Sequence, residues 1–270
     1  MRSIVHISDI HFGQADPVVV ERLIEKIGEL GPDLVVVSGD LTQRARKKQF
    51  AAARAFLDRL PVPQIVVPGN HDVPLYNVFD RFFNPLTKFR KYITSDLTPE
   101  FYDDDSAVLG INTARSLTIK GGRINQGQVD QVLERLGSLT SQKFKIIVTH
   151  HPFDLPEGFD EDDIVGGAKS VMPQLVGCGA DIFLAGHLHV SHITHSARRY
   201  RLDNGYSALI IQAGTAASTR ERGEENSFNV LELDHPLLVI KRFQCSVPAA
   251  GFHLATTEQF TKTEVGWSRM

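Results

Sequence analysis

Three consecutive polar residues, Asn70, His71 and Asp72, follow a glycine and a short apolar run at 64–67. The apolar run predicts a buried strand that ends in a turn. In open α/β sheets, ligands bind outside the carboxyl ends of the strands. An amide oxygen, an imidazole and a carboxylate at such an end can supply a metal ligand, an acid and a group that orients it. Taken alone, the stretch is equally typical of a polar turn held by side-chain hydrogen bonds.

Polar residues also follow other apolar runs along the chain, and we call each such group, at the end of a predicted strand, a polar ending. Asp9 and His11 follow the apolar run 2–8, and alternate side chains of an extended segment point the same way. Asp40 follows the apolar run 34–37. Two later runs end in histidines: His150 and His151 after 144–148, and His187 and His189 after 181–185. This recurrence at successive strand ends favours one shared site over core packing.

Helical patterns separate the first three strands. Pro17 begins a helix whose apolar residues repeat with the helical period until Gly31 and Pro32 stop it. A second helical pattern carries Phe50 and Leu60 on one face. About thirty residues lie between successive polar endings, as parallel βαβ units require. The spacing therefore predicts parallel strands whose carboxyl ends share one edge of a sheet.

The pattern changes twice further along. Residues 74–105 show no sheet period and predict a surface excursion with a helix or two, which could form a wall of a substrate pocket. Strands are then predicted at 107–111, 144–148 and 181–185, with helices near 126–136 and 168–176. After residue 190, antiparallel strands are predicted at 206–212, 227–233 and 237–243, with Asn204-Gly205 as a hairpin turn and a less regular tail. We expect a single domain over 1–270, with the polar endings in 9–189 and the antiparallel strands and tail in 190–270.

Composition narrows the class of protein. The chain has 270 residues, 42% of them hydrophobic, and a net charge of -3. These values suit a globular protein and give no reason to expect non-specific binding to DNA or acidic membranes. Two cysteines make no disulfide framework, and no signal peptide or membrane span of ~20 apolar residues is recognisable. We therefore expect a cytoplasmic protein.

Three other segments have an expected role that follows from their neighbours in the sequence. Arg44, close to Asp40, is the best candidate for a cation that attracts phosphate, whereas most charges near it predict a solvated helix face. The acidic residues 160–163 are expected to be solvated. The small-residue loop 214–219 could line the site.

The collected donors suit transition-metal chemistry. Carboxylate, amide and imidazole groups without thiolate favour Mn²⁺, Fe or Zn²⁺ over a structural sulfur-ligated site. Seven donors are too many for one catalytic ion, but they divide into two sets of four if one carboxylate is shared. They are Asp9, His11, Asp40, Asn70, His150, His187 and His189. Two ions ~3.5–4 Å apart clamp the attacking and leaving oxygens of an in-line displacement, which fits phosphate esters.

In this order the clusters resemble the calcineurin-like metallophosphoesterase superfamily. They read Asp-x-His, Gly-Asp, Gly-Asn-His-Asp, His and Gly-His-x-His, and span residues 9 to 189. The Gly-Asp-Leu-Thr form at 39–42 and the His-His-Pro form at 150–152 look most like bacterial class III cyclic-nucleotide phosphodiesterases and glycerophosphodiesterases. The resemblance implies an α/β fold, a four-layered α/β/β/α sandwich (the metallo-dependent phosphatase fold).

The resemblance also implies a role for each residue. One metal ion would be held by Asp9, His11, Asp40 and His189, and a second by Asp40, Asn70, His150 and His187. His71 would face the scissile phosphate or protonate the leaving oxygen, and Asp72 would orient the His71 ring. His151 would lie outside the ligands. The implied activity is hydrolysis of a small phosphodiester, a 3′,5′-cyclic nucleotide or a glycerophosphodiester, through attack by a metal-bound hydroxide.

Several alternatives stay open. A repair-type nuclease shares the opening motif, but no longer chain with a basic groove is evident, so nucleic acid is an unlikely partner. A phosphomonoesterase is a further option. A non-catalytic metal-dependent scaffold would have no need of the His71 and Asp72 pair. A homodimer built through the C-terminal strands is implied only by the resemblance.

Overall fold

Parallel strands from the first third of the chain form one side of the larger of two sheets. The computed structural model describes residues 1–118, 120–139, 143–219 and 224–270. In this sheet the first three strands run parallel and the later ones join antiparallel. The seven strands lie in the order β13 (Gly266–Arg269), β12 (His253–Thr263), β11 (Leu237–Cys245), β10 (Asn226–Asp234), β1 (Arg2–Ile7), β2 (Leu34–Val37) and β3 (Gln64–Val66). The predicted parallel βαβ repeat is thus confirmed.

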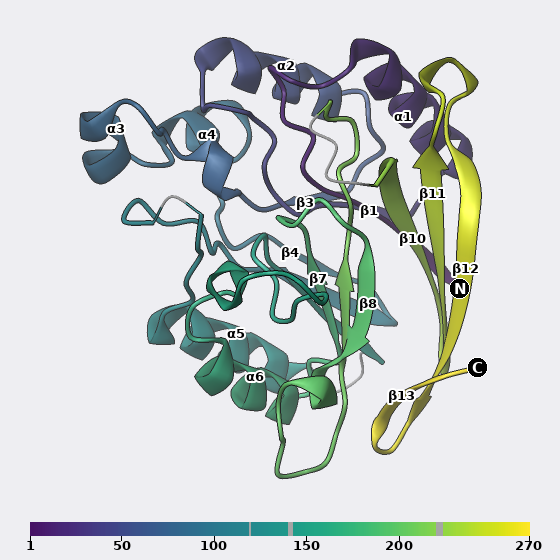
Figure 1. The fold of residues 1–270 in the computed structure, drawn as a ribbon. Coiled ribbons are helices and arrows are strands. Elements are labelled where there is room, and N and C mark those ends of the chain that lie inside the picture. Colours follow the sequence, from purple (N-terminus) through teal and green to yellow (C-terminus); the bar gives the residue numbers. More distant parts are fainter. Residues whose placement is uncertain (119, 140–142, 220–223) are drawn as a thin grey trace.

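The middle of the chain forms a second sheet that faces the first (Figure 1). Its central strands are parallel, and an antiparallel strand lies at each edge. The order is β4 (Glu100–Tyr102), β5 (Ser106–Gly110), β6 (Phe144–Val148), β7 (Ile182–Ala185), β9 (Leu209–Gln212) and β8 (His192–His195).

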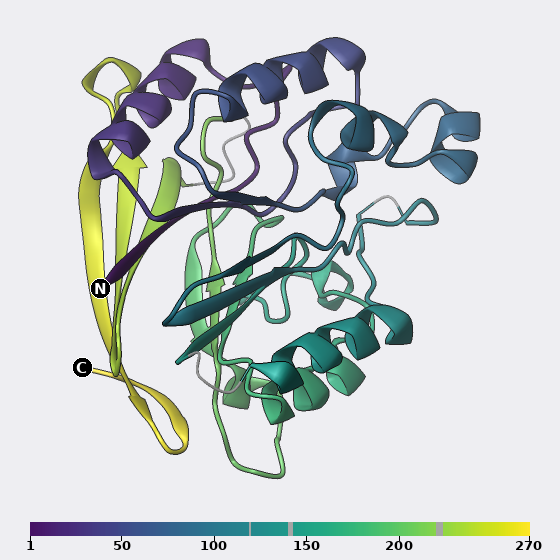
Figure 2. The same cartoon turned by 180° about the vertical axis from the view of Figure 1, so that it is seen from behind.

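Helices cover the outer faces of both sheets, as Figures 1 and 2 show. The larger sheet carries α1 (Pro17–Leu30) and α2 (Lys47–Leu57), and the smaller sheet carries α5 (Gln126–Ser138) and α6 (Ala168–Gly177). The excursion holds the short helices α3 (Val78–Phe83) and α4 (Thr87–Tyr92). The predicted four-layered α/β/β/α sandwich is therefore confirmed.

Alternation along the strands builds the core in three layers. Val35 and Val37 of β2 pack outward against α1 and α2, while Leu34 and Val36 pack inward against the second sheet. A third apolar layer lies between the second sheet and α5 and α6. Strands that are buried on both faces explain the continuous apolar runs of the sequence.

The antiparallel pairing predicted around Asn204-Gly205 is confirmed for β8 and β9, but these two residues are not the tight two-residue loop of a hairpin. The Asn204 side chain accepts a hydrogen bond from the backbone N–H of Tyr206, so the pair does form a turn. That turn lies within a longer connection, 196–208, between β8 and β9. β9 also runs parallel to β7 on its other side, so it is antiparallel to only one of its two neighbours.

The tail is more regular than expected, because β12 and β13 form an antiparallel pair. The Trp267 indole N–H donates to the Asp181 carbonyl oxygen at 3.2 Å, and the ring stacks on Phe144. Lys262 pairs with the Asp181 carboxylate. These contacts join the two sheets at the end of β7 opposite its polar ending.

Among the residues that the structure describes, no helix has both the length and the apolar character needed to cross a bilayer.

Candidate metal centre

The polar endings meet at one edge of the sandwich, and several have unusual backbone conformations. Five of the seven predicted ligands have a left-handed backbone, with φ between 53° and 77°: Asp9, His11, Asp40, His187 and His189. Such conformations cost on the order of 1–3 kcal/mol each and collect at functional sites. Asp and His accept them more readily than most residues.

The first predicted set is assembled. The Nε2 atom of His11 lies 3.0 Å from His189 Nε2 and 3.6 Å from Asp9 Oδ1, and all three side chains are buried. Asp9 Oδ2 accepts hydrogen bonds from Ser8 and from the backbone of His187. Asp9 Oδ1 has no hydrogen-bond partner among the described residues. A buried carboxylate oxygen that faces two imidazole nitrogens fits a bound cation.

Asp40 lies between the two predicted sets. Its Oδ2 atom is 3.7 Å from His11 Nε2, and its Oδ1 atom is 3.4 Å from His150 Nε2. Each carboxylate oxygen thus faces a different imidazole. This arrangement fits a carboxylate shared between two ions.

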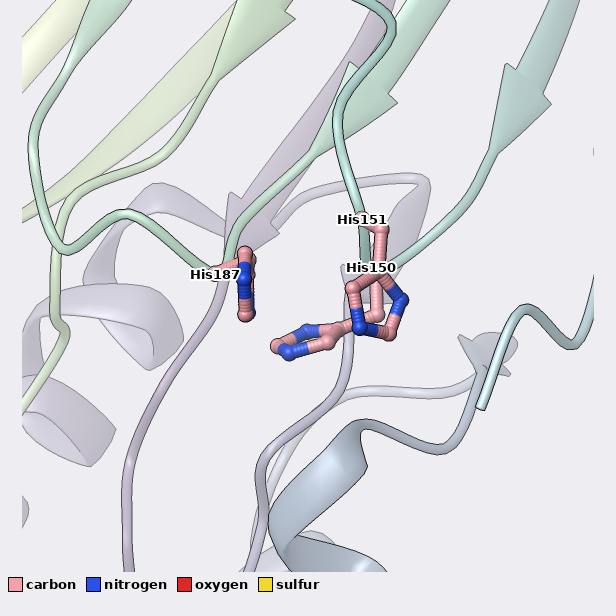
Figure 3. A group of neighbouring side chains, drawn as sticks. All are labelled: His150, His151 and His187. Carbon is pink, nitrogen blue, oxygen red and sulfur yellow. The ribbon is translucent and has the colours of Figure 1, made fainter. Parts of the chain in front are cut away.

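The second set lies on the other side of Asp40. His150 donates from Nδ1 to the Ser38 carbonyl oxygen at 2.7 Å, which directs Nε2 toward Asn70 Oδ1, 3.0 Å away. Fixing the tautomer through the far nitrogen is typical of metal-binding histidines. The His187 ring lies 5.1 Å from the His150 ring, and Figure 3 shows these rings close together with His151.

His151 belongs to the same cluster of imidazoles but both its ring nitrogens are engaged. Nδ1 lies 2.7 Å from the Thr113 hydroxyl, and Nε2 lies 2.8 Å from the Lys120 carbonyl oxygen. A carbonyl can only accept, so the proton is on Nε2 and the Thr113 hydroxyl donates to Nδ1. In this arrangement both ring nitrogens of His151 have hydrogen-bond partners, although the ring lies close to those of His150 and His187.

The glycines beside Asp40 allow this close packing. A Cβ atom on Gly69 would lie 2.1 Å from Asp40 Oδ1. Gly39 has φ of 93°, and a Cβ there would lie 2.6 Å from His150 Nδ1. Only glycine permits this approach of the two loops.

His71 lines a pocket of about 210 Å³ beside the cluster. Its Nδ1 atom donates to the Gln43 carbonyl oxygen at 2.9 Å. The prediction that Asp72 orients this ring is wrong. The Asp72 carboxylate is buried and accepts from the backbone N–H groups of Thr42 and Gly69. Asp72 thus joins the two loops that carry Asp40 and Asn70.

The electrostatics of the cluster favour positive charge. Burial alone would raise the pKa of Asp40, but the neighbouring imidazoles, His150 foremost, hold it well below its usual range. Burial alone would lower the pKa of His150, yet the Asp40 carboxylate raises it to about 9. Protons bound here occupy positions that cations can take, because metal binding displaces them.

The pocket contains residues that the sequence patterns did not single out. Arg81 of α3 and Lys120 line it together with Arg44, which was predicted. Asp163 also lines it, and its Oδ1 atom lies 3.6 Å from His187 Nε2, so the expectation of a wholly solvated acidic loop is wrong there. In loop 214–219, which was predicted to line the site, the Thr215 hydroxyl donates to the backbone carbonyl oxygen of Asp9. The excursion does form a wall of the pocket, as predicted, through Leu75 and Arg81.

Residues 2–191 match the sequence model of the calcineurin-like phosphoesterases. The chain belongs to this family. The family uses divalent metal ions, and the buried Asp and His clusters supply suitable donors.

Particular relatives add detail. The chain is 36% identical over 85 residues to the glycerophosphodiester phosphodiesterase GpdQ of Enterobacter lignolyticus. This match covers 26% of this chain and 29% of that protein. It is 26% identical over 160 residues to a probable cyclic nucleotide phosphodiesterase of Synechococcus, covering 56% of this chain and 58% of that one. The matches thus span less than two thirds of either relative.

The fold resembles that of purple acid phosphatase PPD1 from yellow lupin, with a TM-score of 0.70. Sequence identity is 14%, and the match covers 96% of this chain and 53% of that one. At this identity the similarity concerns the fold.

Proposed function

We propose that the protein is a phosphodiesterase that uses two metal ions. One ion would be held by Asp9, His11, Asp40 and His189, and the other by Asp40, Asn70, His150 and His187. The observation that carries the proposal is the position of Asp40, whose two oxygens face imidazoles of different sets. The donors suit Mn, Fe or Zn. When bound, such ions activate water near neutral pH and withdraw charge from a phosphate ester.

The chain's own residues would perform the remaining tasks. Gln43 fixes the His71 ring through Nδ1, so the proton for the leaving oxygen would be carried on Nε2. Arg44, Arg81 and Lys120 attract an anionic substrate into the pocket. Asp72 keeps the loops that carry His71 and Asp40 together. These hydrogen bonds of Asp72 connect the loop that carries His71 to the loop that carries Asp40.

The proposed substrate is a small phosphodiester. The names of the two relatives above, which refer to cyclic nucleotides and to glycerophosphodiesters, support this choice over a monoester. The size of the pocket, about 210 Å³, also favours a small group at the reacting centre. A cytoplasmic location stays a prediction from the sequence, and a homodimer stays an expectation from the family resemblance.

The test is steady-state hydrolysis with added Mn²⁺. The substrates are bis(p-nitrophenyl) phosphate, p-nitrophenyl phosphate, 3′,5′-cAMP, glycerophosphodiesters and single-stranded DNA. We expect fast turnover of diesters and slow turnover of the monoester. Degradation of DNA with inert small diesters would identify a nuclease instead. Two metals per chain without hydrolysis of any substrate would contradict the proposal and favour the scaffold.

A further inference from the structure

Large apolar side chains are exposed around α3. Of the described phenylalanines, the three that are exposed all lie on this helix: Phe79 at 65%, Phe82 at 49% and Phe83 at 73%. Tyr76 and Leu117 are exposed at 73% and 83%. We call these five side chains the aromatic patch. Single exposed apolar residues are ordinary, but a group of this kind marks a binding surface.

The aromatic patch adjoins the catalytic pocket. Arg81, on the same helix as the three phenylalanines, lines the pocket and donates to the Thr118 carbonyl oxygen, beside Leu117. The Arg44 guanidinium, also in the pocket wall, lies 5.7 Å from the centre of the Tyr76 ring. The pocket and the patch thus share a boundary that consists of two guanidinium groups.

Arg81 is ready to receive an anion at this boundary. It is only 7% exposed, and it donates hydrogen bonds to the neutral carbonyl oxygens of Pro74 and Thr118. Among the described residues, no carboxylate forms an ion pair with it. A buried guanidinium without a carboxylate partner favours an anionic ligand.

The pocket is too small to enclose a large substrate. Its volume of about 210 Å³ is below the ~300–1,000 Å³ typical of sites that enclose a whole drug-sized ligand. A phosphate with one small arm fits, and a longer second arm would extend beyond this volume. In Figures 1 and 2, α3 and α4 project beyond the two sheets, so an arm that leaves past Arg81 meets the exposed helix.

We propose that the aromatic patch holds the alkyl or acyl arm of an amphiphilic phosphate ester, while its phosphate occupies the catalytic pocket. Cations at the pocket boundary and apolar side chains beyond it match the anionic head and apolar tail of such a molecule. The inference rests on the proposed phosphodiesterase function and assigns its substrate to a lipid-like class.

The test uses p-nitrophenyl alkyl phosphates with methyl, butyl and octyl arms, below their critical micelle concentrations, with the Mn²⁺-loaded protein. A fully buried methylene is worth about fourfold in kcat/KM, and a half-buried one roughly twofold. The octyl-to-methyl ratio of kcat/KM is therefore expected to be on the order of 100-fold. A ratio near one for the unmodified protein would overturn the inference.

Two variants test whether the octyl-to-methyl ratio of kcat/KM depends on the aromatic patch. The double variant Phe79→Ser, Phe83→Ser is expected to lose most of the octyl-to-methyl ratio. Leu254→Ser is the matched control, because Leu254 is 49% exposed on β12, in the other part of the molecule, and its variant should keep the ratio. An unchanged ratio in the double variant would overturn the assignment to the patch.

Alkylphosphonates separate this inference from the proposed function. They resist hydrolysis, and their affinities can be measured by calorimetry. Affinity that rises with chain length, without hydrolysis of any diester, would keep the lipid-like ligand and refute the phosphodiesterase. Hydrolysis of diesters without any dependence on chain length would keep the phosphodiesterase and refute the lipid-like ligand.

Other occupants of the aromatic patch have their own signatures. Sedimentation of a dimer that dissociates in the double variant would assign the patch to a second copy of the chain. Binding to phospholipid vesicles without chain-length dependence would assign it to a membrane surface. Either result would overturn the inference.

Discussion

The His71 imidazole donates from Nδ1 to the carbonyl oxygen of Gln43, 2.9 Å away. A backbone carbonyl therefore performs the orienting role that the sequence suggested for Asp72. With Nδ1 held by this contact, we propose that the protonated ring donates a proton to the leaving oxygen from Nε2.

His71→Ala is expected to retain both metal ions and lose most turnover. Positioned acid–base groups contribute on the order of 10²–10⁴-fold, and the kcat for a diester should fall by about this factor. Metal content by mass spectrometry and kcat on bis(p-nitrophenyl) phosphate check the prediction. Loss of metal would make His71 a ligand.

Asp40→Asn is expected to weaken both ion sites together, because each oxygen of Asp40 faces a different set of donors. The measurement is metal content per chain after dialysis, with Asp33→Asn as a control on a carboxylate outside the site. Loss of one ion only would show that Asp40 does not bridge, and retention of two ions with full activity would contradict its role altogether.

His151→Gln is expected to keep the metal content of the native protein and to lose stability. Its two ring nitrogens serve Thr113 and Lys120, and an unsatisfied buried partner costs about 1–3 kcal/mol. Denaturant unfolding of the metal-free protein gives the free energy change. A variant that is folded but lacks an ion would identify His151 as a ligand.

Asp181 makes stability depend on pH away from the metal centre. Burial raises its pKa to about 6 in the folded protein, although Lys262 opposes the shift. The folded state therefore binds this proton more tightly than the unfolded state. Its contribution to stability is complete below about pH 4 and is lost as the pH rises through about 6, a change on the order of 2–3 kcal/mol.

Asp181→Asn should remove this dependence. Urea denaturation from pH 4 to pH 7 gives the unfolding free energies of the native protein and of the variant. As the pH rises, the native protein should lose stability relative to the variant. Other titrating groups are common to both proteins, so their contributions cancel in the difference between the two unfolding free energies. A difference that does not change with pH would show that the pKa of Asp181 is not raised.

The strand ends could be predicted because they depend on local patterns. Apolar runs such as 34–37 are buried on both faces, and the polar residues after them must lie at the sheet edge. The parallel order then brings distant endings together, and the structure places the predicted donors side by side. That they bind two ions and hydrolyse a diester stays a prediction.

Other features depend on contacts that no local pattern records. Arg81 lies in an excursion without a sheet or helix period, and carbonyl oxygens of Pro74 and Thr118 position it. β12 is largely exposed and lacks an alternating apolar pattern, so its pairing with β11 is not evident from its sequence. Asp163 reaches the pocket only because the loop after β6 folds back over His187.

The left-handed backbone at the ligand positions decides how an inert form of the protein should be made. Alanine at Asp9 or Asp40 would remove a donor and also resist the backbone shape that the loop requires. Asparagine accepts that shape and differs from aspartate by one polar group. A form intended to trap an intact substrate for crystallography should therefore carry asparagine at these positions, because alanine would disturb the loops as well as the chemistry.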